Sequence, residues 1–357
     1  MILSRLSAQN FRNLDAADHA FHPLANIVVG RNGQGKTNLL EAVYFLATTK
    51  SFRTSRVASL FRFDSPSLFV SGSVERGGIE RSMSVGLEAE SKRRVLTINA
   101  EKVALTQYLN ALTVFAYSSS RLEILRGSPE ERRRFLDRGI ASINAGYLEQ
   151  LTRYGRALKQ RNALLHDVAS GAAAQASLAA WDAEFAAAAA PVWNARGAYV
   201  QQLSETFREI VALHRYRVSD VELVYKPATG EIPRVAEIRA RMSLAGPQRD
   251  VLDFEAGGRP AAEVLSGGEQ KMIVLFLKFA KIELFRRRTD ESPLFLLDDI
   301  DAELDLDILQ ELLQKLPPKT QVFATSAKER FLDVLEAGPH RRLVIENGRV
   351  TAVQDFA

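Results

Sequence analysis

The sequence predicts an α/β fold in which both ends of the chain form one head and a mostly helical arm is inserted between them. Strand-like patterns fill the first hundred residues, helical periodicity with few turn signals fills 120–215, and strand patterns return after about residue 217. The predicted boundaries are 1–117 and 217–357 for the head (lobe I) and 118–216 for the arm (lobe II).

The N-terminal part of the head is expected to alternate strands with one helix. Apolar residues that recur at spacings of three and four predict the helix, and period-two alternation predicts the strands. The Gly77-Gly78 pair is a turn signal between two of them. The predicted elements are an opening strand from Ile2, a buried strand at 26–29, a helix from Gly35, and meander strands at 68–74, 81–87 and 94–99.

The arm combines an amphipathic stretch at 143–166 with an Ala-rich segment, 171–190, which ends at Pro191. Trp181 and Phe185 lie one helical turn apart, so this segment is predicted to be a helix with a face to pack, with an exposed loop near 167–177.

The C-terminal part of the head returns to strands and helices in alternation. Asn347-Gly348 between two apolar runs is typical of a type I′ hairpin turn. The predicted elements are strands at 221–225 and 251–255, a turn at Gly257-Gly258, helices at 268–288 and 304–316, and strands at 294–297 and 321–325.

Composition and patterning exclude several classes of protein. With 46% hydrophobic and 25% charged residues, the chain has the balance of a globular protein, and a net charge of +4 is too small to name a nucleic-acid partner. The absence of cysteine excludes disulfides, a cysteine nucleophile, thiolate zinc sites and iron–sulfur clusters. No apolar run reaches 18 residues and no secretory signal is evident, so we expect a cytoplasmic protein.

A phosphate-binding motif follows the predicted strand at 26–29 and opens the predicted helix. The residues Gly30, Arg31, Asn32, Gly33, Gln34, Gly35, Lys36 and Thr37 match GxxxxGK[ST]. Glycines let backbone N–H groups point at phosphate oxygens, and the helix adds its positive N-terminal end. Lys36 is expected to reach the β- and γ-phosphates of ATP, and the Thr37 hydroxyl to ligate Mg²⁺.

Two further segments complete a nucleotide site. The apolar strand at 294–297 ends in Asp298, a candidate Mg²⁺ ligand, and Asp299, a candidate to polarise the attacking water. In the stretch Leu265–Gln270 (LSGGEQ), Ser266 is a candidate N-cap, and Gly267, Gly268 and Glu269 open a helix, so this turn is a second anion site.

The order of these motifs is that of the ABC-type ATPases, and the chain resembles the RecF family of the SMC and Rad50 branch. The matching stretches are 10–14, 30–54, Gly127-Ser128-Pro129 with Arg132, Arg133 and 135–137, 246–250, and 298–305. The resemblance implies an ABC-type P-loop ATPase head with an inserted helical arm. It also implies that residues 266–269 act in trans on the ATP of a second copy. Asp305 falls at the D-loop, and Thr325 or Ser326 at the position of the γ-phosphate switch.

The resemblance implies an ATP-dependent DNA-binding protein of replication and recombinational repair, including the SOS response. ATP would drive dimerisation and DNA clamping, and slow, DNA-stimulated hydrolysis would release the clamp. The expected partners are gapped DNA with single- and double-stranded parts, a second copy of the chain, RecR, RecO and RecA, which the protein would help to load. No membrane partner is expected.

Two alternatives stay open from the sequence. LSGGEQ is typical of ABC transporter nucleotide-binding subunits, but those usually have closer motifs, a Glu where Asp299 stands and a His where Thr325 and Ser326 stand. Departures from the expected RecF pattern, such as Gln248 and Val251 in GPQRDV and Ala302 in the D-loop, leave room for a divergent RecF-like ATPase.

A basic part of the arm is the predicted DNA contact. Between Arg121 and Arg161 the chain has ten Lys or Arg against five Asp or Glu. The predicted phosphate contacts are Arg132, Arg133, Arg134 and Arg138. The alternative for these residues is a solvated helix with local pairs to Glu130, Glu131 and Asp137, and a second candidate surface lies at Lys92, Arg93 and Arg94.

Overall fold

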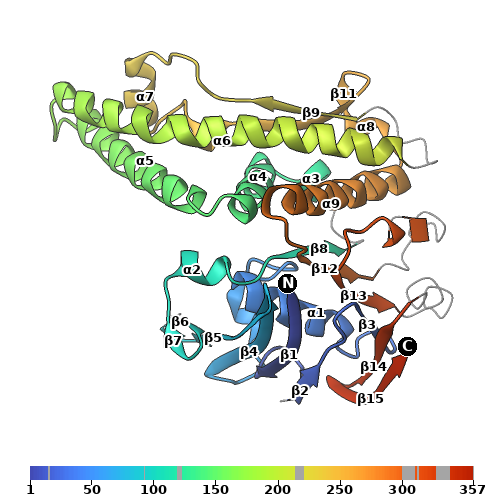
Figure 1. Cartoon of the computed structure of the whole chain (residues 1–357). Coiled ribbons are helices and arrows are strands. Elements are labelled where there is room, and N and C mark those ends of the chain that lie inside the picture. The colour runs from blue at the N-terminus through green and yellow to red at the C-terminus, as the bar shows by residue number, and fades with distance from the viewer. Residues whose placement is uncertain are drawn as a thin grey trace. The chain divides into compact units, whose positions relative to one another are not determined.

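The computed structural model describes residues 1–14, 17–91, 93–118, 123–213, 221–299, 310–311, 313–326 and 338–356. The chain divides into two compact units: unit 1 comprises Met1–Arg121, Ala212–Tyr216 and Lys271–Ala357, and unit 2 comprises Leu122–Val211 and Arg217–Gln270. Unit 1 contains two sheets with helices and unit 2 is mostly helical (Figure 1), so the predicted α/β class is confirmed.

The first sheet of unit 1 is antiparallel, in the order β2-β1-β4-β5-β6-β7. Its central pair, β4 and β5, is joined by the Gly77-Gly78 turn, and both glycines have positive φ. The predicted meander is therefore confirmed. The strands are β1 (Ile2–Gln9), β2 (Ala17–Ala20), β4 (Ser67–Arg76), β5 (Ile79–Glu88), β6 (Arg94–Ile98) and β7 (Glu101–Lys102).

The second sheet of unit 1 has the order β15-β14-β3-β13-β12-β8 and is parallel except for β15. Parallel neighbours end at the same edge, so the loops that follow β3, β12 and β13 emerge together. The strands are β3 (Ala25–Val29), β8 (Val114–Ser118), β12 (Leu294–Asp298), β13 (Gln321–Ser326), β14 (His340–Glu346) and β15 (Arg349–Phe356).

Helix α1 (Lys36–Thr48) packs between the two sheets of unit 1 (Figure 1). It is buried all round from Leu39 to Ala47, as expected of a helix that is covered on both sides. One hydrophobic cluster accordingly joins α1 to residues of both sheets, among them Val70 and Phe323. Further helices of this unit are η1 (Val57–Leu60), α2 (Leu105–Leu109) and most of α9 (Gly267–Thr289).

A buried amide also links the two sheets. The Gln321 side chain accepts a hydrogen bond from Leu3 N at 2.7 Å and donates to Leu3 O and His22 O, both at 2.9 Å. Because Gln321 is fully buried, these bonds replace those it would make to water. The first and last thirds of the sequence are thus joined at the core of unit 1.

Unit 2 consists of helices and a three-stranded antiparallel sheet in the order β11-β10-β9. Helix α4 begins with a capping box, in which Ser128 Oγ accepts from Glu131 N and Glu131 Oε2 accepts from Ser128 N. The elements are α3 (Glu123–Arg126), α4 (Pro129–Ile143), α5 (Tyr147–Ala169), η2 (Gln175–Ser177), α6 (Leu178–Ala212), β9 (Val221–Lys226), α7 (Arg234–Ala240), η3 (Pro247–Arg249), β10 (Val251–Ala256), β11 (Arg259–Pro260) and α8 (Ala261–Val264).

Helix α6 continues through Pro191 instead of ending there as the sequence pattern indicated. The proline removes one backbone hydrogen bond, but Ala188, Ala189 and Val192 around it are buried. Packing therefore offsets the local cost. The loop expected near 167–177 is shorter, because α5 extends to Ala169 and η2 begins at Gln175.

The boundary of the helical unit differs from the predicted one. Residues 217–270 were expected in the head, but Arg217–Gln270 cluster with the helices of unit 2. Side chains from three helices bind this stretch: Arg132 of α4 contacts Asp253, Arg161 of α5 contacts Glu237, and Arg196 of α6 contacts Asp250. Alternation of apolar and polar residues along a strand predicts that one face of the strand is covered. It does not predict which element covers that face.

Other predicted strands and helices of the C-terminal part are present where the structure describes them. Of the helix expected at 304–316, the structure describes 310–311 and 313–316; residues 310–311 and 313–314 are helical, and 315–316 are not. Across the described ranges, no helix has both the length and the apolar character needed to cross a membrane.

Candidate functional site

The loop between β3 and α1 is shaped by glycines. Gly30, Gly33 and Gly35 have φ values of 150°, 82° and 112°. At Gly30 a Cβ atom would lie 2.4 Å from Ile345 O, so a side chain cannot fit there. The loop therefore passes against β14 only because glycine stands at this position.

The Lys36 side chain is hydrogen-bonded to the backbone of this loop. Its Nζ donates hydrogen bonds to Gly30 O at 2.6 Å and Arg31 O at 3.1 Å, and the residue is buried. Carbonyl oxygens thus hold the ammonium group at the centre of the loop. A phosphate, being an anion, would be a stronger partner for this charge.

The β14–β15 hairpin holds the outer side of the loop. Gly348 N donates to Gln34 O at 2.8 Å, and Asn347 N donates to Gln34 Oε1 at 2.6 Å. The hairpin was predicted from Asn347-Gly348, but its contact with the loop was not. That contact depends on β14 pairing with β3, which no local signal reveals.

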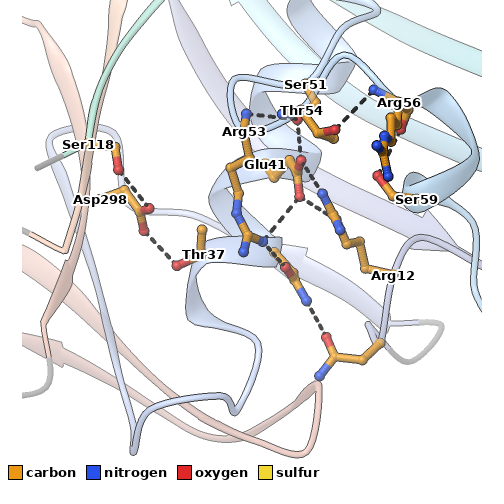
Figure 2. A network of polar contacts seen from close by, with 12 residues as sticks. Arg12, Thr37, Glu41, Ser51, Arg53, Thr54, Arg56, Ser59, Ser118 and Asp298 are labelled. Carbon is orange, nitrogen blue, oxygen red and sulfur yellow. Dashed lines mark hydrogen bonds and ion pairs between the residues drawn. The ribbon is translucent and has the colours of Figure 1, made fainter. Parts of the chain in front are cut away.

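Asp298 is the centre of a polar cluster at the carboxyl end of the parallel strands. Thr37 Oγ1 donates to Asp298 Oδ1 at 2.8 Å across 261 residues of sequence, and Thr325 Oγ1 donates to the same oxygen at 3.0 Å. Ser118 Oγ lies 3.5 Å from Oδ2 (Figure 2). The structure thus brings together Thr37, Asp298 and Thr325, three of the residues selected from the sequence.

Burial raises the pKa of the Asp298 carboxyl above its ordinary value, against the opposing effect of the two threonine hydroxyls. The residue is 4% exposed, and the donors on its Oδ1 are neutral hydroxyls. A hydroxyl and a carboxylate side by side are the hard oxygen ligands that Mg²⁺ prefers, together with water and phosphate. Thr37 and Asp298 therefore fit a magnesium ion, whose charge would also stabilise the ionised carboxylate.

Asp299 has a different environment from its neighbour. It is exposed and has a φ of 53°, so the chain turns sharply after β12. Its backbone N donates to Thr325 Oγ1 at 2.8 Å. Thr325 therefore contacts both acids, and these bonds favour it over Ser326 as the candidate switch residue.

A second polar cluster, not predicted as a site, surrounds Glu41 on α1. This carboxylate is fully buried and accepts from Arg12 Nε at 2.6 Å and Nη2 at 2.8 Å, and from the Ser51 hydroxyl. Arg53 lies 3.6 Å from it, and Figure 2 shows these side chains pointing toward Glu41. The signal in the sequence was a glutamate inside the apolar run of α1. A buried glutamate needs a buried cationic partner, but the sequence pattern does not show which arginine pairs with it.

The cluster continues toward the phosphate-binding loop. Arg53 Nη1 donates to Asn38 Oδ1 at 2.7 Å, and Asn38 Nδ2 donates to Asn13 Oδ1 at 2.6 Å. A Cβ at Gly35 would lie 3.2 Å from that same Asn13 oxygen. The turn after β1 and the segment after α1 are therefore tied to the first turn of α1.

In unit 2, residues 266–269 form the predicted helix start. Glu269 N donates to Ser266 Oγ at 3.3 Å, and Glu269 Oε2 accepts from Ser266 N at 2.8 Å and Ser266 Oγ at 2.7 Å. The predicted N-cap at Ser266 is confirmed. These hydrogen bonds from Ser266 lower the pKa of Glu269, and its carboxylate satisfies the Ser266 amide at this helix end. Gly267 and Gly268 have open space around them.

The four arginines predicted to contact DNA differ in their surroundings. Arg132 donates to Leu252 O, Leu125 O and Asp253, at 2.7–3.1 Å, and Arg133 donates to Asp250 O at 3.0 Å. These two guanidinium groups therefore hold unit 2 together, and their contact with DNA stays a prediction.

Arg134 and Arg138 are exposed, and Arg134 pairs with Glu130 one turn earlier. For these two residues DNA contact stays a prediction. Of the second candidate surface, Arg94 donates to Thr49 Oγ1 at 2.9 Å and Arg93 is exposed. Lys92 and the D-loop residue Asp305 lie outside the described residues.

Comparisons with known proteins agree with this site. The family model described as RecF/RecN/SMC N terminal domain matches residues 2–343. The chain is 34% identical to "DNA replication and repair protein RecF" of Lactobacillus acidophilus over 346 residues, which are 91% of this chain and 92% of that protein. It is 32% identical to the protein of the same name from Geotalea daltonii over 371 residues, covering 98% and 100%.

A solved structure of "the recombination mediator protein RecF-ATP in RecFOR pathway" is similar over all of this chain and 98% of that one, with a TM-score of 0.88 and 25% identity. The similarity therefore covers both units and is not confined to the nucleotide-binding motifs, which leaves the transporter-subunit alternative without support. The phosphate-binding loop, the acids at the end of β12 and these matches together establish that the chain belongs to the RecF family of ABC-type ATPases.

Proposed function

We propose that this chain is a cytoplasmic ATP-dependent DNA-binding protein of DNA replication and repair. The observation that carries the proposal is the hydrogen bond between Thr37 and Asp298, which places two hard oxygen ligands beside the phosphate-binding loop. Its relatives carry the name "DNA replication and repair protein", and one was solved as RecF-ATP.

In the proposed nucleotide complex, the loop 30–37 cradles the phosphates of ATP. Lys36 exchanges the carbonyls of Gly30 and Arg31 for the β- and γ-phosphates. Thr37 and Asp298 would hold Mg²⁺, which would supply positive charge to neutralise the phosphates. The hairpin contact of Gln34 with Asn347 and Gly348 supports the proposal, because it fixes the loop before ATP arrives.

Hydrolysis is assigned to the exposed acid. Asp299 polarises the attacking water, and its exposure supports this role because water reaches it directly. Thr325 bonds to the backbone of Asp299 and to the carboxylate of Asp298, so it couples the candidate metal ligand to the water-activating residue.

The proposed cycle requires a second copy of the chain. The Ser266–Glu269 turn of one copy is proposed to meet the γ-phosphate in the other, with the phosphate displacing the Glu269 carboxylate from Ser266. ATP would then favour the dimer, because ATP contacts both surfaces only there. In this cycle the dimer clamps gapped DNA, DNA stimulates hydrolysis, and the protein acts with RecR and RecO to load RecA.

One experiment tests whether DNA binding and dimerisation depend on ATP. Binding of gapped DNA and the oligomeric state are measured with and without ATP and Mg²⁺, for the wild type and for Lys36→Ala and Asp299→Asn. Lys36→Ala is expected to abolish ATP-dependent binding, and Asp299→Asn to accumulate the ATP-bound dimer because the base is lost. The control is Lys102→Ala, an exposed lysine of β7. ATP-independent DNA binding by Lys36→Ala at the wild-type level would contradict the proposal.

A further inference from the structure

The segment after α1 combines cations with exposed apolar side chains. Residues 50–64 contain Lys50, Arg53, Arg56 and Arg62 against a single acid, Asp64. Phe52 and Leu60, both nearly fully buried, anchor the segment to the core of unit 1. Between and after these anchors the backbone lies at the surface, and we call residues 53–64 the arginine–phenylalanine segment.

Phe63 differs from the other residues of this segment in its exposure. Its side chain is 90% exposed, and the next most exposed large apolar residue of the described chain is Leu213, at 63%. Exposing a phenylalanine forfeits about 2 kcal/mol of burial free energy. Such a ring on a folded protein is a candidate for contact with another molecule.

The backbone of Phe63 is fixed. Arg62 N donates to Asn10 O at 2.8 Å, and Ser65 N donates to Arg62 O at 3.1 Å, which closes a turn with Phe63 near its tip. Asp64 follows with a φ of 55°. A ring on an ordered tip loses little conformational entropy when a partner binds.

Two cations, Arg56 and Arg62, precede this ring in the sequence. The Arg56 side chain is exposed and has no ion-pair partner among the residues described in unit 1 (Figure 2 shows it beside Ser59). Arg62 lines a hollow of about 420 Å³ together with Glu346, Asn347, Arg349 and Thr351. Arg62, Arg349 and Glu346 give the lining of this hollow a net charge of +1. Together with Arg56 and the exposed ring of Phe63, this surface favours an anionic partner with a flat apolar part.

Single-stranded DNA has this combination of features. Its phosphates suit arginine, and its unpaired bases present faces that stack on aromatic rings. In a duplex the base faces are covered by their neighbours, so the ring of Phe63 would have no partner there. A protein partner would need a larger apolar surface than Phe63 and the half-exposed Val57 provide.

We propose that Phe63 stacks on an unpaired base of single-stranded DNA while Arg56 and Arg62 contact the neighbouring phosphates. The proposal rests on the proposed DNA-binding function and specifies which part of a gapped substrate this surface contacts. It assigns a stacking residue to a segment that the sequence motifs left without a role.

The test compares oligonucleotides that differ only in their bases. Fluorescence anisotropy with ATP and Mg²⁺ measures binding of a labelled thymidine 12-mer, an abasic 12-mer with the same phosphates, and a 12-base-pair duplex. Phe63→Ala is expected to weaken thymidine 12-mer binding about tenfold and to leave the abasic strand and the duplex unchanged. Phe63→Trp should restore binding, with indole fluorescence quenched by the thymidine 12-mer and not by the abasic one. Leu105→Ala, which truncates a half-exposed residue of α2, is the matched control.

The salt dependence of the binding constant distinguishes base stacking from contacts between arginine and phosphate. Phe63→Ala should leave the slope of log K against log salt unchanged, whereas Arg56→Gln should reduce its magnitude by about 0.7, the value for one phosphate of a single strand.

The outcomes are distinguishable. Failure of the wild type to bind any of the three DNAs would refute the proposed function itself. Wild-type binding that Phe63→Ala leaves unaltered would refute only the stacking. An equal loss on the abasic strand or the duplex would also refute it, as would a loss confined to ATP affinity or dimer formation, because the ring would then have a different partner.

Discussion

Two buried carboxylates, Asp298 in unit 1 and Asp250 in unit 2, have different partners. In unit 1, Asp298 is bonded to the hydroxyls of Thr37 and Thr325, and burial raises its pKa. In unit 2, Asp250 is fully buried and is bonded to the Arg196 guanidinium at 2.7 Å. A carboxylate with neutral donors can still receive a cation, whereas one with a guanidinium already has its counter-charge. We therefore expect Asp298 to bind a cation and Asp250 to stabilise the fold.

The cluster in unit 2 is extensive. Asp250 also accepts from Trp193 Nε1, Tyr225 Oη and Ala228 N, and Arg196 reaches Asp137 as well. Removing one member of such a network leaves buried charges without partners, which typically costs several kcal/mol. Removing the charge of Asp298 leaves neutral hydroxyls, which costs much less in stability and more in function.

The largest expected effect is on folding. Arg196→Met should lower the free energy of unfolding by about 3–5 kcal/mol, because Asp137 and Asp250 lose their shared cation. Urea denaturation followed by circular dichroism measures this change. Arg153→Met removes an exposed pair with Glu184 and should change stability little. Equal midpoints for the two variants would remove the distinction between the clusters.

The next largest expected effect is a loss of ATP hydrolysis in a variant that keeps its fold. Asp298→Asn keeps an oxygen that can accept from Thr37 and Thr325 but lacks the charge that holds Mg²⁺. We expect ATP hydrolysis to fall at least about 100-fold, of the order seen when a transition-state electrostatic group is removed. The melting temperature without nucleotide should not fall. A large loss of thermal stability would show that Asp298 is structural, like Asp250.

A smaller effect concerns pH. The folded state raises the pKa of Asp298, so it holds a proton that the unfolded state has released once pH exceeds the ordinary value of 3.8. The contribution of this group to stability therefore decreases as pH rises from 3.8 toward the raised pKa, by about 1.4 kcal/mol for each pH unit that separates the two pKa values. Unfolding of the nucleotide-free protein, measured against pH, should show this decline. The Asp298→Asn variant should lack it, and identical profiles would contradict the assignment.

The smallest expected effect is at the surface of α4. Arg132 and Arg133 bind neighbours inside unit 2, whereas Arg134 and Arg138 are exposed. Replacing Arg134 and Arg138 by Gln should flatten the salt dependence of duplex binding by about two if each contacts one phosphate, without lowering stability. An unchanged slope would place the DNA contact elsewhere on the chain.

Most elements and the nucleotide site were predictable from local patterns. Periodicity located the strands and helices. The motifs and the family resemblance selected Thr37, Asp298 and Thr325, which the structure brings together. The partners of Glu41, and Asn347 beside Gln34, were not predicted, because they depend on which strands are neighbours. The placement of 217–270 was missed for the same reason, since side chains from three helices determine it.

The hairpin that holds Gln34 has a consequence for how the protein is made. The phosphate-binding loop leaves the ribosome early, but Asn347, whose backbone N donates to Gln34, lies 313 residues later in the sequence. At about 5–20 residues per second, translation needs about 15 to 60 seconds to supply it. β3 also lacks its β14 neighbour during that time. A nascent chain therefore cannot assemble the complete nucleotide site, and only a fully synthesised molecule can enter the ATP cycle.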